Sequence, residues 1–210
     1  MNENWRATLR GLPVFRNELP TFDTGSAPSN PLDLFDEWMS RAIEQGVEQP
    51  HAMTLATAGP AARTVILKNV DARGFWFASS SESPKGRELD AQPRAALLFY
   101  WRELGRQVRI VGAVGRGSAE ESAADFRERG LHARAGVLAG HQSEPVERDG
   151  AEAVADAEAR AKSGEISPAW TAYFVAAESV EFWQASTTRE HVRLLYTRGV
   201  GGWRTDILVP

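Results

Sequence analysis

Five short runs rich in β-branched and aromatic residues alternate with compact turn signals in the middle of this chain. The runs span residues 52–57, 63–70, 74–79, 94–101 and 106–116. Gly-Pro, Asp-Ala-Arg-Gly and Glu-Leu-Gly segments lie between several of them. Strands of this length joined by short turns pair as antiparallel neighbours. We therefore expect an antiparallel sheet that curls into a barrel.

The carboxyl-terminal part returns to the same pattern. Further strands are predicted at residues 171–176, 179–184, 193–198 and 202–209, with Glu178 separating the first two. No internal repeat of 20 to 50 residues interrupts the chain. Together with the helices described next, these strands predict one α+β domain in which helices surround an antiparallel split β-barrel.

Helix starts are readable from capping residues. Asn30 followed by Pro31 begins an amphipathic run that ends at Gly46. Ser83 and Pro84 open a second helix, and Ser118 with Glu121 forms a capping box before a third helix ending at Gly130. An Ala- and Glu-rich segment predicts a fourth helix over residues 147–162.

Residues 1–29 differ from the rest of the chain because prolines and glycines are scattered among apolar residues. We interpret them as an irregular amino-terminal arm that packs on the barrel, since its aromatic and leucine side chains need burial. These are Trp5, Leu9, Leu12, Phe15 and Phe22. Residues 30–210 then form a single domain, as a chain of 210 residues allows.

Composition excludes several classes of protein. There is no cysteine, so disulfides, thiolate nucleophiles and cysteine-ligated metals are excluded. His51, His132 and His141 show no metal-ligand spacing and are interpreted as structural or solvent-facing, so we expect no metal. A net charge of −4 argues against a broad nucleic-acid surface. Without a long apolar run or a signal-like amino terminus, we expect a soluble, cytoplasmic protein that does not bind membranes.

Two candidate anion sites involve lysine, which supplies only three of the 24 basic residues. Arg63 and Lys68 bound the segment Arg-Thr-Val-Ile-Leu-Lys and would point to opposite faces of a strand. The alternative is a plain strand with solvated ends. Lys85 lies at the helix start Ser-Pro-Lys-Gly, where free N–H groups and the helix dipole attract phosphate. An ordinary helix cap is the alternative there.

A third candidate site is the row formed by Arg189, His191 and Arg193, with Trp183 upstream. On a strand these three side chains share one face, which places two cations beside a group that titrates near neutral pH. Such a row suits an anionic or electron-rich ring. The alternative is a surface strand whose cations pair with carboxylates.

Taken in order, these segments resemble the pyridoxamine 5′-phosphate oxidases, which are FMN-dependent enzymes with a split-barrel fold. The similarity runs from Asn30 to Pro210, nearly the whole chain. The matching segments are NPLDLFDEWMSRAIEQGV, HAMTLAT, RTVILK, GFWFAS, SPKGREL, PRAALLFYW, LGRQVRIVG, HQSEP, VEFWQ and REHVR, followed by GWRTDILVP.

The resemblance implies an FMN site at a homodimer interface, with a carboxyl-terminal dimerisation region. The implied cofactor-binding residues are Arg63, Thr64, Val65, Ile66, Leu67, Lys68, Ala78, Ser79, Lys85, Gln107, Gln142, Ser143, Trp183 and Arg193. Lys68 and Arg129 would bind the substrate phosphate. Arg189 and His191 would flank the substrate ring as the catalytic residues.

The implied reaction oxidises pyridoxamine or pyridoxine 5′-phosphate to pyridoxal 5′-phosphate while O₂ becomes H₂O₂, a step in pyridoxal phosphate biosynthesis. This sequence departs from the family where it carries Asp125 and Ala133 in place of a tyrosine and a serine that help to bind phosphate. Pro84 and Ala78 also replace a usual arginine and tyrosine near the flavin. Two alternatives therefore remain, an FMN-dependent oxidase of another aromatic metabolite, such as a dihydrophenazine-type precursor, and a non-catalytic flavin-binding protein.

Overall fold

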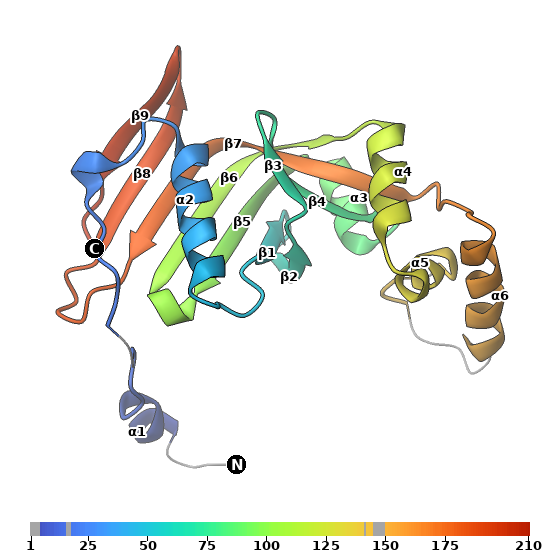
Figure 1. Cartoon of the computed structure of the whole chain (residues 1–210), viewed down its shortest axis with the longest axis horizontal. Helices are drawn as coiled ribbons and strands as arrows, with labels where there is room; N and C mark the ends of the chain where they lie inside the picture. The colour runs from blue at the N-terminus through green and yellow to red at the C-terminus, as the bar shows by residue number, and fades with distance from the viewer. Residues whose placement is uncertain (1–4, 16–17, 141, 145–149) are drawn as a thin grey trace.

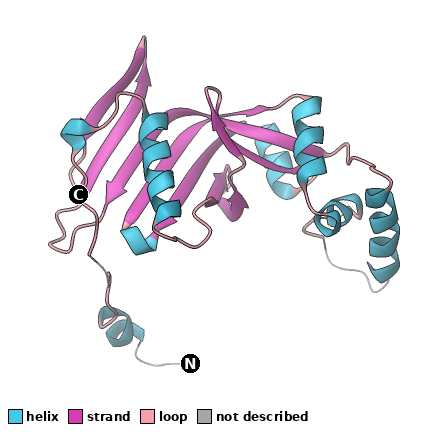
Figure 2. Cartoon of the chain, in the orientation of Figure 1, coloured by secondary structure: helices cyan, strands magenta, loops and turns pink. Residues whose placement is uncertain are grey.

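A curled antiparallel sheet of nine strands organises the computed structural model, which describes residues 5–15, 18–140, 142–144 and 150–210 (Figures 1 and 2). The strands are β1 (Ala52–Thr57), β2 (Ala61–Ile66), β3 (Asn69–Asp71), β4 (Gly74–Ser80), β5 (Arg94–Trp101), β6 (Arg106–Arg116), β7 (Trp170–Gln184), β8 (Val192–Gly199) and β9 (Gly202–Ile207). Seven strands follow the order β2-β1-β5-β6-β7-β4-β3, while β8 pairs with β7 and β9 with β8. The predicted α+β class with a curled antiparallel sheet is confirmed.

The segment predicted as one strand over residues 63–70 is divided in two. β2 pairs with β1 up to Ile66, and β3 pairs with β4 from Asn69 onward. Between them the backbone N–H of Lys68 donates to the carbonyl oxygen of Trp76 at 2.8 Å. Because the chain changes its hydrogen-bonding partner at this point, β2 and β4 come close together and the sheet curls.

The two strands predicted on either side of Glu178 are one continuous strand, β7. The prediction was wrong because Glu178 is the extra residue of a β-bulge within β7. Val111 pairs with Ser179, and the next residue of β6, Gly112, pairs with Ala177. A Cβ on Gly112 would lie 1.9 Å from the carbonyl oxygen of Ala176, so only glycine fits there. The long strand pairs with β4 through its first half and with β8 through its second half.

The helices are α1 (Trp5–Arg10), α2 (Pro31–Glu44), α3 (Pro84–Ala91), α4 (Ala119–Glu128), α5 (Leu131–Leu138) and α6 (Gly150–Lys162), with short 3₁₀ turns η1 (Thr24–Ser26) and η2 (Arg102–Leu104). Asn30, Ser83 and Ser118 cap α2, α3 and α4, as predicted. The predicted helix to Gly130 instead ends at Glu128, and a further helix, α5, follows. Of the predicted 147–162 helix, residues 147–149 lie outside the described residues.

The main core lies between α2 and the sheet. Phe35 makes edge-on contacts with Phe75 and Phe99, and Trp38 packs against Phe182. A second, smaller core joins α4, α5 and α6 to the start of β7, with Phe126 and Trp170 packed edge to face. In Figure 1 this helical group lies at the opposite end of the long axis from β8 and β9. The two cores therefore support two separate ends of the molecule.

Among the described residues of the amino-terminal arm, those of its second half pack on the rest of the chain. Phe22 lies edge-on against Trp38 with ring centroids 5.0 Å apart, and the Tyr196 hydroxyl donates to the carbonyl oxygen of Pro28. Trp5, Leu9 and Leu12 are instead more than half exposed, so the prediction that they pack on the barrel is wrong for this single chain. In Figure 1 α1 projects away from the sheet. No described helix is both long and apolar enough to cross a membrane.

Candidate functional site

The main cleft of the molecule has a volume of about 940 Å³ and opens between β2, β4, the start of α3 and α5. Most of the residues that the sequence analysis assigned to one half of a cofactor site line it. These are Thr64, Val65, Ile66, Lys68, Ala78, Ser79, Lys85 and Gln142, together with Arg129 of the predicted substrate set. Residues far apart in sequence thus meet at one cavity.

Lys85 is the most unusual side chain in the main cleft because it is a lysine that is only 8 % exposed. Its ammonium group donates to the hydroxyl oxygens of Ser79 and Ser83, at 3.1 and 3.2 Å. Burial lowers the pKa of Lys85, and the nearby Arg63 guanidinium lowers it further. A buried cation that is bonded to neutral hydroxyls at a helix start suits an oxyanion.

Arg63 and Leu67 do not line the main cleft. The Arg63 guanidinium forms an ion pair with Glu88 at 2.9 Å and donates to the Thr57 hydroxyl. Leu67 packs against the main core. Arg63 therefore does not contact the space of the main cleft, but its positive charge lowers the pKa of Lys85, which does line it.

Lys68 occupies the boundary between the main cleft and a smaller cavity of about 230 Å³. Its ammonium nitrogen lies 3.3 Å from Oδ1 of Asp125, which lines the smaller cavity. The other carboxylate oxygen of Asp125 accepts a hydrogen bond from Nε1 of Trp170 at 2.8 Å. Asp125 therefore faces Lys68 and reduces the positive charge that Lys68 presents to the main cleft.

Arg129 lies in the main cleft with its guanidinium 4.2 Å above the Trp170 ring. Its Nε has no hydrogen-bond partner among the described residues, and burial lowers the pKa of the group. Ala133 also lines the cleft and supplies no side-chain donor. Arg129 therefore keeps unused donor capacity at the end of the cleft near Lys68.

A second group of predicted residues lies elsewhere. Gln107, Trp183 and Arg193 line a groove of about 460 Å³ with Tyr100, Glu181 and Pro210. Arg193 forms a 2.7 Å ion pair with Glu181, whose side chain is 5 % exposed and which also pairs with Arg109. In Figure 1 the strand that carries Arg193, β8, lies at the other end of the long axis from α5.

Arg189 and His191 are not on a strand, so the predicted single-faced row with Arg193 is wrong. β8 begins at Val192, and Arg189 lies in the preceding turn with a positive φ of 67°. The backbone N–H of Ser186 donates to Nδ1 of His191 at 3.0 Å, and the imidazole lies 5.0 Å from the Trp183 ring. His191 is thus held beside Trp183 by the turn and not by strand alternation.

The remaining predicted residues lie at the surface. Gln142 and Ser143 are exposed in the segment after α5, and of the two only Gln142 lines the main cleft. His51 and His132 are exposed, and His132 lies 3.6 Å from Glu158. His141 lies outside the described residues. Within the part of the chain that the structure describes, no three His, Asp or Glu side chains gather where they could hold a metal ion.

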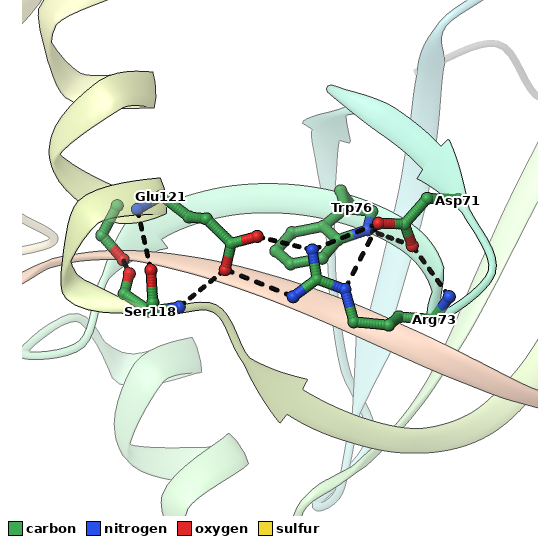
Figure 3. A network of polar contacts seen from close by, with 6 residues as sticks. Asp71, Arg73, Trp76, Ser118 and Glu121 are labelled. Atoms are coloured by element: carbon green, nitrogen blue, oxygen red, sulfur yellow. Dashed lines mark hydrogen bonds and ion pairs between the residues drawn. The ribbon is translucent and has the colours of Figure 1, made fainter.

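Sequence reasoning missed a polar network that joins the β3–β4 turn to α4 (Figure 3). Arg73 bonds both Asp71 and Glu121, and its guanidinium lies 4.2 Å above the Trp76 ring. Glu121 also completes the capping box with Ser118. The capping box is visible in the sequence, but nothing in the pattern indicates that Arg73 reaches a residue 48 positions away.

Two family models match this chain. The model for pyridoxamine 5′-phosphate oxidase matches residues 39–184, and the model for the pyridoxine 5′-phosphate oxidase C-terminal dimerisation region matches residues 170–210. A pyridoxine/pyridoxamine 5′-phosphate oxidase of Bordetella petrii is 46 % identical over 92 % of this chain and 95 % of its own length. One of Rubrobacter xylanophilus is 43 % identical over the whole of both chains.

Solved structures show the same fold. PhzG from Burkholderia lata 383, in complex with tetrahydrophenazine-1-carboxylic acid, superposes with a TM-score of 0.83 at 32 % identity. The match covers 92 % of this chain and all of PhzG. A pyridoxamine 5′-phosphate oxidase-related, FMN-binding protein of Nostoc punctiforme gives a TM-score of 0.69 at 18 % identity, over 88 % of this chain and 98 % of its own. The sheet is therefore a split barrel, as the sequence predicted.

Proposed function

The chain belongs to the pyridoxamine 5′-phosphate oxidase family and is a flavin-dependent oxidase, and we propose that it uses FMN to oxidise pyridoxamine and pyridoxine 5′-phosphates to pyridoxal 5′-phosphate. The names of the relatives at 43 and 46 % identity support this substrate. O₂ would be the second substrate and H₂O₂ the second product. The proposal starts from the main cleft because most of the predicted cofactor residues line it.

The observation that carries the cofactor assignment is the buried ammonium group of Lys85. Burying a cation without an anionic partner is costly, and among the described residues Lys85 bonds only neutral hydroxyls, where the cleft meets the start of α3. A phosphate group bound there would accept charge-assisted hydrogen bonds from Lys85 and from Ser79. The residues present therefore fit the phosphate of FMN.

We further propose that the protein is a homodimer in which each site takes residues from both chains. Lys85 and Lys68 line the main cleft. Trp183 and Arg193 line the other groove, and β8, which carries Arg193, lies at the opposite end of the molecule's long axis from α5 (Figure 1). Trp183 and Arg193 fall within the segment matched by the dimerisation region. In a dimer with a two-fold axis, the main cleft of each chain can meet the Trp183 and Arg193 groove of the other chain, which gives two equivalent sites.

On the substrate side, Lys68 and Arg129 hold the acidic group of the substrate at one end of the main cleft. Arg189 and His191 of the other chain orient its ring. Because Nδ1 of His191 accepts the Ser186 N–H, the neutral imidazole carries its proton on Nε2 and donates a hydrogen bond from that atom. If His191 removes a proton from the substrate, the hydrogen bond from Ser186 or the proton on Nε2 must first be released.

Bound FMN would supply the hydride acceptor and the route by which electrons reach O₂. The test of the proposed function begins with the visible spectrum of the purified protein. Pyridoxamine and pyridoxine 5′-phosphates are then added in air, and H₂O₂ and aldehyde are measured. We expect a yellow protein that forms both products. A colourless protein that takes up no added FMN would refute the cofactor assignment, and a yellow protein inert toward both vitamers would refute the substrate assignment.

A second substrate class is supported by one observation, the ion pair between Lys68 and Asp125. A carboxylate within the phosphate anchor favours an aromatic metabolite without a phosphate. PhzG, whose structure holds tetrahydrophenazine-1-carboxylic acid, matches this fold at 32 % identity. Reduction of the bound flavin by a dihydroaromatic carboxylic acid, but not by the vitamers, would establish this second candidate.

A further inference from the structure

We propose that Asp125 is a specificity-determining residue that adapts the substrate anchor of the main cleft to a singly charged acidic group, such as a carboxylate, in preference to a phosphate dianion. The inference rests on the proposed flavin-dependent oxidase function and, of its two candidate substrate classes, favours the aromatic metabolite without a phosphate. The residues involved are Lys68, Asp125 and Arg129, here named the anchor cluster. Each of the three contacts another member of the cluster or the shared ring of Trp170.

The carboxylate of Asp125 is held at both oxygens. Oδ1 lies 3.3 Å from the Lys68 ammonium nitrogen, and Oδ2 accepts the Trp170 indole N–H at 2.8 Å. Its side chain is 15 % exposed, whereas that of Lys68 is 38 % exposed and lines the main cleft. Asp125 contacts Lys68 from the side of the smaller cavity and does not line the main cleft. It therefore competes for the Lys68 ammonium group with any anion that enters the main cleft.

The charges of the anchor cluster define the ligand that it suits. Lys68 and Arg129 are two cations, and the Asp125 carboxylate cancels one of them, which leaves a single net positive charge. Burial lowers the pKa of Arg129 and the Asp125 charge acts against that effect, so Asp125 interacts with both cations. A phosphate monoester carries a charge of about −1.5 to −2 at neutral pH, whereas a carboxylate carries −1. The charge of a carboxylate therefore balances the net charge of the anchor cluster, whereas the charge of a phosphate dianion is larger than the cluster can balance.

The network in Figure 3 keeps Asp125 in place. Glu121 lies one turn before Asp125 on α4 and bonds Arg73 of the β3–β4 turn, while Lys68 immediately precedes β3. The two partners of the ion pair are therefore carried by segments that are themselves joined. Asp125 cannot leave Lys68 by a shift of α4 without breaking the bonds between Arg73 and Glu121.

The test compares D125N with the wild-type holoenzyme. Asparagine keeps an oxygen that can accept the Trp170 N–H, but it removes the negative charge. Each FMN-loaded protein is titrated anaerobically with pyridoxal 5′-phosphate and with phenazine-1-carboxylate, and binding is followed by the change in flavin absorbance. E128Q is the matched control, because Glu128 lines the same small cavity and forms no ion pair with another described residue.

We expect D125N to bind pyridoxal 5′-phosphate about tenfold or more tightly than the wild type, with little change for the carboxylate. E128Q should change neither affinity. The proposal would be overturned if D125N bound both ligands more tightly by the same factor, or if neither affinity changed. It would also be overturned if neither protein bound either ligand. If the ligands bind as expected but no vitamer is oxidised by the wild type, the proposed function fails while the role of Asp125 stands.

A double-mutant cycle with K68M separates the proposed mechanism from an indirect effect. In the K68M background the effect of D125N on pyridoxal 5′-phosphate affinity should shrink strongly, because Asp125 no longer has an ammonium group to neutralise. An undiminished effect would overturn the assignment of Lys68 as the group on which Asp125 acts. The FMN content of D125N and of E128Q shows that their cleft is intact, since neither residue belongs to the implied cofactor-binding set.

Discussion

The ammonium nitrogen of Lys85 lies 3.1 Å from the hydroxyl oxygen of Ser79 inside the main cleft. The lysine is 8 % exposed and Ser79 is 5 % exposed, so the contact excludes most of the surrounding water. A desolvated cation with neutral partners makes the apoprotein less stable than it could be and makes the cleft attractive to a phosphate.

Replacing Lys85 by methionine should therefore separate stability from cofactor binding. K85M removes a buried charge, so we expect the free energy of unfolding of the apoprotein to stay equal or increase. We expect FMN affinity to fall by about 100-fold, because charge-assisted hydrogen bonds to the phosphate are lost. Urea denaturation and fluorescence titration with FMN measure the two effects. K162M, at the exposed end of α6, should change neither.

FMN affinity should depend on pH through Lys85. Its pKa is lowered below the usual 10.5 by burial, and then by Arg63. The unfolded chain therefore binds this proton more tightly than the folded apoprotein, and the lysine's contribution to stability rises with pH between the lowered pKa and 10.5. A bound phosphate favours the charged lysine, so FMN affinity should fall as pH rises through the lowered pKa.

The measurement is a set of FMN titrations at increasing alkaline pH in wild type and K85M. Burial also lowers the pKa of Arg106, to about 10, so other groups titrate in this range and the comparison between the two proteins is needed. A fall of the same size in both would show that Lys85 is not responsible.

The capping box of α4 should contribute measurably to stability. Ser118 Oγ accepts the Glu121 N–H at 3.1 Å, and Glu121 accepts the Ser118 N–H at 2.7 Å. S118A should lower the free energy of unfolding by about 1 kcal/mol, as measured by urea denaturation. S163A, which removes an exposed hydroxyl after α6, is the control and should have a smaller effect.

His191 and Arg189 should affect the oxidation of substrate more than the binding of cofactor. H191A and R189A each remove a group proposed to orient the substrate ring, so we expect flavin reduction to slow by about 10- to 100-fold while FMN remains bound. Stopped-flow absorbance measures the reduction, and H132A, with a side chain 89 % exposed, is the control. Unchanged reduction rates would contradict the proposed roles.

A mixture of two impaired variants should regain activity if each site is shared between chains. In a heterodimer of K85M and H191A, one site receives both intact residues and the other receives neither. Refolding the two variants together in equal amounts should restore about a quarter of wild-type activity, because half of the dimers are mixed and each has one intact site. If both residues act within one chain, the mixture gains no activity over the separate variants.

The local elements were predictable because their signals lie within a few residues. Asn30, Ser83 and Ser118 cap helices as expected, and strand-forming runs occur at β1, β4, β5 and β6. The helix α5 was missed because its start at Gly130 has no capping side chain. The continuity of β7 was missed because Glu178, a polar residue in an apolar run, is accommodated as the extra residue of a β-bulge, so the strand continues past it.

The candidate site was only partly predictable. Resemblance to the family identified Lys85, but not that it is buried among hydroxyls, since burial depends on how β4, α3 and the segment between them pack. Strand alternation predicted that Arg189 and His191 share one face of a strand with Arg193. That prediction was wrong because β8 begins one residue after His191. The boundary of the arm at residue 29 and the cytoplasmic location remain predictions.

The sequence by itself determined the fold class, the helix caps, the family and the identity of the charged residues, because these depend on residue type and local spacing. Only the tertiary structure decided which charges meet. Lys68 and Asp125 are 57 positions apart, and their carriers, the β2–β3 connection and α4, are brought together by sheet curling and by the bonds between Arg73 and Glu121. Contacts of this kind depend on packing over the whole chain, and here they change the charge that the substrate would meet.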